Sequence, residues 1–145
     1  MDVDWSEPTD EGIVIGEVDG HRFELSGEGS FREFSFGGWA VGCSWHVRKP
    51  DDPASLDGWG LVDPVRELFV LRGSVPTGAV EVVTVQGDER STVILLDDGE
   101  TERPGWIGFS RSTGPPTQLA WTDPGGSTRQ VPLLKGRGTT GGVTN

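Results

Sequence analysis

The chain lacks the features that would indicate a disulfide framework, a membrane-spanning helix or nucleic-acid binding. It has 145 residues and a single cysteine, so no disulfide can form within it. No apolar run approaches the roughly 18 residues that a transmembrane helix needs. Basic residues are few, 12 against 23 acidic ones, for a net charge of −11. Because nucleic acids and anionic membranes are held mainly by lysine and arginine, this charge argues against both as partners.

Strong helix formers are scarce as well. Alanine occurs only at positions 40, 54, 79 and 120, tyrosine is absent, and the chain carries 23 glycines and 10 prolines. Valine and threonine are common, and both suit a pleated sheet. A chain of this length is typical of one domain that folds without disulfides or other covalent cross-links. We therefore expect an all-β protein, an antiparallel β-sandwich or barrel of about nine to eleven short strands.

Composition divides the chain into three parts. We predict a loose acidic segment over residues 1–12, a single all-β domain over 13–134, and a flexible tail over 135–145 that has no apolar face. The start of the chain has no basic stretch followed by an apolar one, which a secretory signal requires. We expect a cytoplasmic protein if Met1 is native, and an extracytoplasmic one if the chain has been trimmed.

Three local patterns predict particular strands and turns. Asp19-Gly20 lies between two β runs and favours a two-residue hairpin turn. Residues 39–48 alternate between apolar and polar, which predicts a strand with Cys43 on its apolar face as a small buried side chain. Residues 67–71 are apolar at nearly every position, which is typical of a central strand covered on both faces.

Four segments carry a resemblance to a known family: GEVDGHRFEL (16–25), FGGWAVGC (36–43), LFVLRGSVPTGAVEVVTV (68–85) and QLAWTDPGGSTRQV (118–131). Their order is similar to that of a β-rich ectodomain found in actinobacterial envelope proteins. The resemblance implies a binding or structural role and no assigned enzymatic activity. This chain differs from that pattern in having Cys43 alone where a paired cysteine is expected.

The tryptophans suggest where a partner would bind. Residues 49–64 are rich in proline and aspartate and predict the longest loop, and such loops often carry function. Trp59 stands between two glycines in this loop, and Trp106 follows Pro104-Gly105 at a predicted strand edge. Exposed aromatic rings give large, rigid contact areas. We predict partner contacts from Trp59, Asp57, Asp52 and Trp106; the alternative is that Trp59 folds back over the end of the sandwich.

Reactive or metal-binding arrangements are weak in this sequence. Cys43 and His46 are three residues apart, so a strand would turn them to opposite faces, and we predict no metal site. Ser44 and His46 would lie about 7 Å apart along a strand, too far for a nucleophile and its base. The aspartates of the loops are expected to shape turns, with a weak calcium site as the alternative. We predict no catalytic residue and no cofactor.

These observations favour a non-catalytic binding module, with the 49–64 loop and exposed tryptophans presented to a partner protein that has a basic surface. A glycan is the second choice of partner, and the oligomeric state stays open. One alternative is an acidic inhibitor or immunity-type protein that blocks a basic enzyme site. Another is a small β-barrel enzyme, cyclase-like or isomerase-like, with an internal pocket and Glu33, His46 and Arg48 as polar groups.

Overall fold

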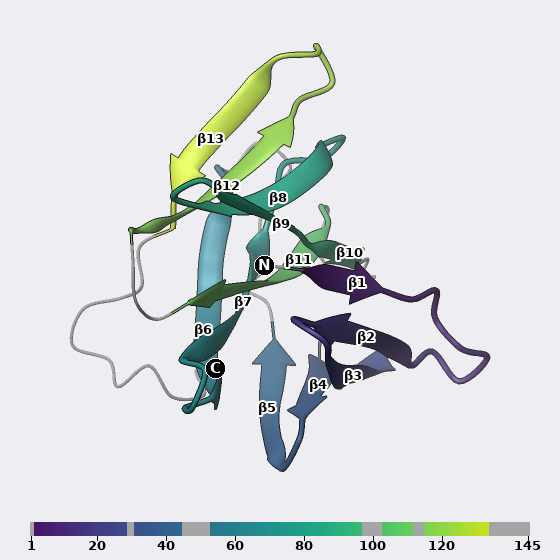
Figure 1. The fold of residues 1–145 in the computed structure, drawn as a ribbon. Coiled ribbons are helices and arrows are strands. Elements are labelled where there is room, and N and C mark those ends of the chain that lie inside the picture. Colours follow the sequence, from purple (N-terminus) through teal and green to yellow (C-terminus); the bar gives the residue numbers. More distant parts are fainter. Residues whose placement is uncertain (1, 29–30, 45–52, 97–102, 112–114, 134–145) are drawn as a thin grey trace.

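The computed structural model describes residues 2–28, 31–44, 53–96, 103–111 and 115–133. Within these ranges the chain forms thirteen strands and no helix. The strands make three antiparallel sheets, and none of the three closes into a barrel (Figure 1). The all-β, sandwich-type prediction is therefore confirmed, with more strands than expected. The predicted tail, 135–145, lies outside the described residues.

The first sheet, sheet A, is built from consecutive hairpins. Its strands, in spatial order, are β1 (Val3–Trp5), β2 (Val14–Val18), β3 (His21–Glu28), β4 (Phe31–Phe36) and β5 (Trp39–Ser44). Asp19 (φ 50°) and Gly20 (φ 82°) form the predicted two-residue turn, because both adopt the positive φ that it requires. The prediction of a loose segment over 1–12 is wrong for residues 3–5. They pair with β2, and Val3 and Trp5 pack against the core.

The rest of the chain forms two further sheets. Sheet B has the order β10 (Ile94–Leu96), β11 (Gly105–Arg111), β7 (Leu68–Ser74) and β6 (Ser55–Asp63). Sheet C has the order β13 (Thr128–Pro132), β12 (Thr117–Thr122), β8 (Val80–Gln86) and β9 (Glu89–Thr92). Only Val93 separates β9 from β10, so the chain passes from sheet C into sheet B without a loop.

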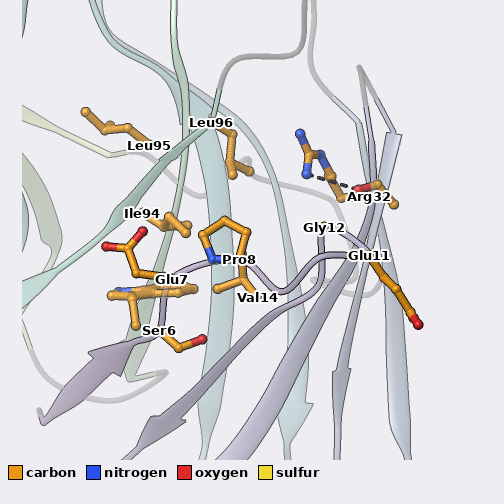
Figure 2. A pocket seen from close by; sticks show the side chains of 12 residues that line it. Ser6, Glu7, Pro8, Glu11, Gly12, Val14, Arg32, Ile94, Leu95 and Leu96 are labelled. Carbon is orange, nitrogen blue, oxygen red and sulfur yellow. Dashed lines mark hydrogen bonds between the residues drawn. The ribbon is translucent and has the colours of Figure 1, made fainter.

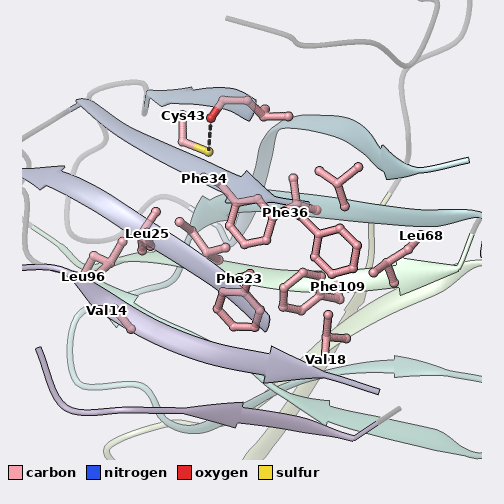
Figure 3. Close-up of a cluster of buried hydrophobic side chains, with 14 residues drawn as sticks. Val14, Val18, Phe23, Leu25, Phe34, Phe36, Cys43, Leu68, Leu96 and Phe109 are labelled. Carbon is pink, nitrogen blue, oxygen red and sulfur yellow. Dashed lines mark hydrogen bonds between the residues drawn. The ribbon is translucent and has the colours of Figure 1, made fainter. Parts of the chain in front are cut away.

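Sheet B is the middle layer of the protein. One apolar cluster joins it to sheet A (Figure 3) and contains Val14, Val18, Phe23, Leu25, Phe34, Phe36, Val41, Cys43, Val62, Leu68, Val70, Leu96, Ile107 and Phe109. A second cluster joins it to sheet C and contains Trp59, Leu71, Val75, Ala79, Val82, Trp106, Leu119, Trp121 and Leu133. Residues of β7 enter both clusters, which confirms the prediction of a central strand covered on both faces.

Aromatic rings form the centre of the contact between sheets A and B. The Phe109 ring of β11 lies 5.2 Å from that of Phe23 and 5.5 Å from that of Phe34, and those two rings lie 5.2 Å apart. Trp5 adds a fourth ring, 4.9 Å from Phe23 and 5.8 Å from Phe109. Such pairs contribute about 0.5–1.5 kcal/mol each beyond the area that they bury.

Gly73 of β7 lies very close to the backbone of β6. A Cβ atom at this position would lie 1.7 Å from the Ser55 carbonyl oxygen and 2.8 Å from Trp106 Nε1. Both neighbours are held in sheet B, and Trp106 is fully buried. The strand therefore has no space for any side chain at residue 73.

We predict that Gly73→Ala lowers the free energy of unfolding by about 2–3 kcal/mol, because backbone atoms must move to admit the methyl group. The matched control is Gly38→Ala, since a Cβ at that position in the β4–β5 turn meets no atom within 4 Å. We expect the control to change stability by less than about 0.5 kcal/mol. Urea unfolding followed by tryptophan fluorescence measures both, and equal losses in the two variants would contradict the prediction.

Candidate functional site

The residues predicted to contact a partner do not form an exposed surface. Most of the predicted 49–64 loop is strand β6, and Trp59 is only 8% exposed there. Trp106 is 0% exposed and Asp57 is 8% exposed. The prediction of exposed contacts is thus wrong for these three residues, because β6 and β11 belong to the middle sheet and both faces of that sheet are covered. Asp52 lies outside the described residues.

Asp57 instead belongs to a buried polar cluster at one end of sheet B. It lies at a β-bulge, where the pairing of β6 with β7 skips one residue. Its carboxylate accepts a hydrogen bond from Ser55 Oγ at 2.8 Å, and the Ser55 and Ser74 hydroxyls are also 2.8 Å apart. Arg103 donates from Nε and Nη2 to Ser74 Oγ, and from Nη2 to the Pro53 carbonyl oxygen at 2.6 Å. These bonds satisfy groups that burial would otherwise penalise, which is a structural role.

Cys43 is buried where strands β5 and β6 approach one another, as its apolar position predicts. Its side chain is 1% exposed, and Arg72 of β7, also 1% exposed, hydrogen-bonds with the thiol. Burial raises the pKa of Cys43 to about 11, and the nearby Arg72 charge offsets part of that rise. Burial lowers the pKa of Arg72, which Cys43 and Asp57 partly offset. A thiol held in its neutral form is a poor nucleophile, so Cys43 is a packing residue.

The Cys43 pKa predicts a loss of stability at alkaline pH. The ordinary pKa is 9.0 and the folded value is about 11, so folding favours the neutral thiol. This contribution is fully present below pH 9 and is lost as the pH rises to 11, by about 2–3 kcal/mol in total. The chain has no tyrosine and only Lys49 and Lys135 as lysines, so few other side chains titrate in this range. Urea unfolding between pH 7 and 10.5 measures the slope.

The control for this prediction is Cys43→Ala. It removes the titrating group. We therefore expect the variant to be less stable than the unmodified protein, with a flatter dependence of stability on pH. If the unfolding free energies of the two proteins fall in parallel between pH 9 and 10.5, the thiol does not cause the decline.

The candidate site is an open groove of about 800 Å³ between sheet A and the edge of sheet B (Figure 2). Apolar side chains from three parts of the chain line it: Trp5 and Pro8 near the N-terminus, Val14 of β2, and Ile94, Leu95 and Leu96 of β10. Trp5 is fixed there by stacking on Phe109 and by a 3.2 Å hydrogen bond from Nε1 to the Thr92 carbonyl oxygen. A mostly apolar wall with a few polar groups is typical of a binding site.

The polar groups of the groove differ in charge. Arg32 of β4 lines it, and its Nη1 donates to the Gly27 carbonyl oxygen at 3.0 Å. The Nε of Arg32 is buried and has no hydrogen-bond partner within the described part of the chain. Glu7 and Glu11 also line the groove, and Figure 2 shows Glu7 and Arg32 toward opposite ends of it. A ligand in the groove would therefore meet an acid at one end and a guanidinium at the other.

The groove follows the outer edge of strand β10. Side chains of successive strand residues point to opposite faces, yet Ile94, Leu95 and Leu96 all line the groove. The groove thus reaches the edge of the strand as well as one of its faces. Among the described residues, β10 pairs only with β11, which leaves its other edge open.

Sequence reasoning missed this site. The one available signal is the alternation of Val3, Asp4 and Trp5, which is a short strand pattern inside a segment that reads as acidic lead-in. The pairing of residues 3–5 with β2 and the proximity of Thr92 to Trp5 are long-range facts that no local pattern encodes.

No family model, curated protein or solved structure matches this chain. The resemblance to actinobacterial envelope ectodomains and the location of the protein both stay predictions. In the described ranges no helix has the length and apolar character needed to cross a bilayer. The same ranges hold no group of three or more histidine, cysteine, aspartate or glutamate side chains placed to bind a metal ion.

Proposed function

We propose that the protein is a non-catalytic binding module whose partner occupies the groove beside β10. The observation that carries this proposal is the combination of an apolar wall, a strand edge that is open among the described strands, and the Arg32 guanidinium in one place. A guanidinium carries five N–H donors, so a ligand with carbonyl or carboxylate oxygens can bond to it. The contact surface is therefore different from the 49–64 loop that the sequence suggests.

Charge supports a partner with a basic surface. Against one arginine, the first 24 residues carry eight of the 23 acidic side chains: Asp2, Asp4, Glu7, Asp10, Glu11, Glu17, Asp19 and Glu24. Two of them, Glu7 and Glu11, line the groove itself. A like-signed partner would be repelled, whereas a basic one would be attracted and would associate faster at low salt. A glycan is less favoured, because Trp5 uses its ring on Phe23 and Phe109.

The chemistry of the buried groups argues for binding over catalysis. Cys43, Asp57 and Arg72 form a cluster of reactive or charged groups, yet all three are buried inside the sandwich and none lines the groove. Of the polar groups suggested for a barrel enzyme, Glu33 is exposed on β4, while His46 and Arg48 lie outside the described residues. The described sheets do not close, so they do not enclose a barrel interior.

The acidic N-terminal surface also fits an inhibitor that blocks a basic enzyme site, which is the second candidate. The two functions depend on different side chains. An inhibitor of this kind depends on exposed acids such as Asp4 and Glu17, whereas the module depends on the apolar wall of the groove.

A peptide-display experiment tests the proposed function. We expect random 12-residue peptides selected on the immobilised protein to be enriched in lysine and arginine and to bind less well as salt is raised. Leu95→Lys places a positive charge on the groove wall and should reduce binding of the selected peptides by at least about tenfold, because it opposes burial of an apolar contact and repels a basic peptide.

The matched control is Val65→Lys, which makes the same type of change at an exposed valine in the β6–β7 turn. Leu95 is 39% exposed and Val65 88%, so both variants should fold. Peptide binding by Val65→Lys should equal that of the unmodified protein. Enrichment no greater than on an unrelated acidic protein, or an equal loss in both variants, would refute the groove as the binding site.

A further inference from the structure

We infer that the groove binds its partner by strand addition: an extended basic segment pairs with the open edge of β10 and extends sheet B by one strand. This inference rests on the proposed function and specifies how the same groove is used. Extended peptides join open sheet edges through backbone hydrogen bonds, and pockets for alternate side chains supply specificity. The groove beside β10 offers both of these features.

The edge of β10 is the first part of the argument. Ile94, Leu95 and Leu96 pair with Ile107, Trp106 and Gly105 of β11 on one side. On the other side, within the described residues, they take part in no further backbone hydrogen bond of a turn or loop. An unpaired edge of this kind is a template for another extended chain. Its outer side opens onto the groove, so an incoming strand would have a place to lie.

The opposite wall supplies contacts for the side chains of such a strand. Trp5, Pro8 and Val14 face the groove from the N-terminal segment and β2. Because a strand directs alternate side chains to opposite faces, one set would lie against this apolar wall while the other stayed in solvent. The guanidinium of Arg32, which also lines the groove, would then donate to a carbonyl or carboxylate oxygen of the incoming chain.

The charges decide between a partner and a second copy of this chain. A second copy would bring its own net charge of −11 to an edge that Glu7 and Glu11 already make acidic. A segment with lysine or arginine on its solvent-facing side would instead complement these carboxylates. The occupant that the surface fits is therefore an extended, basic segment of another protein.

A titration with a synthetic peptide tests the inference. The probe is a seven-residue peptide that alternates lysine and valine, used beside the most enriched peptide from display. We expect the backbone amides within Ile94–Leu96 that point away from β11 to become protected from hydrogen exchange when either peptide is added, since carbonyl oxygens of the incoming strand accept hydrogen bonds from them. Amides of β13, the outer strand of sheet C, should show no change and serve as the internal control.

A second arm separates backbone pairing from simple occupation of the groove. A copy of each peptide with every backbone nitrogen methylated keeps its side chains and charge but donates no backbone hydrogen bond. Loss of about two such bonds should weaken binding by about tenfold or more. Leu95→Lys should also weaken binding, whereas Val65→Lys should not.

The outcomes distinguish this inference from the function on which it rests. Peptides that bind at the groove without protecting Ile94–Leu96, and whose methylated copies bind equally well, would leave the binding module standing and overturn strand addition. Absence of binding in both the display and the titration would overturn both. A protein that dimerises through β10 without peptide would also overturn the inference, because the edge would then serve a second copy.

Discussion

The Phe109 ring of β11 packs against the Phe23 and Phe34 rings of sheet A, and the groove depends on this contact between the two sheets. It holds the first sheet against the middle sheet, and the two together form the walls of the groove. Trp5 completes this aromatic group, so the N-terminal strand is fixed by the same contact. Together with the hydrogen bond from Trp5 Nε1 to the Thr92 carbonyl oxygen, this contact places Trp5 at the wall of the groove.

Placing one sheet between two others has consequences for its polar residues. Strands β6, β7 and β11 are covered on both faces, so their polar side chains must find partners inside the protein. The Ser55, Ser74 and Arg103 hydrogen bonds, and the position of Arg72 beside Cys43 and Asp57, meet this need, while the buried Trp106 Nε1 has no hydrogen-bond partner within the described residues. Cys43, Asp57 and Arg72 are thus part of the packing, whereas Glu7, Glu11 and Arg32 are charged residues that line the groove.

The sequence predicts what depends on neighbouring residues and misses what depends on distant ones. The Asp19-Gly20 turn, the buried Cys43 and the doubly covered strand near 67–71 follow from turn chemistry and periodicity, and the structure confirms them. Trp59 is predicted to be exposed because the aspartates and glycines around it are typical of a loop, yet it is buried. In the structure the Asp57 bulge and close strand packing use those same residue types inside a sheet. The groove could not be predicted, because it joins residues near positions 5, 32 and 95.

The passage of the chain from β9 to β10 limits how this protein can vary. Val93 is the only residue between a strand of sheet C and a strand of sheet B, and Trp5 and Val3 are tied to Thr92 beside it. Side chains alternate with a period of two, so one inserted residue here would turn every later side chain of β10 to the opposite face. The exposed tip at 37–38 has space around it, whereas a change of length at residue 93 would shift sheet B relative to sheet C.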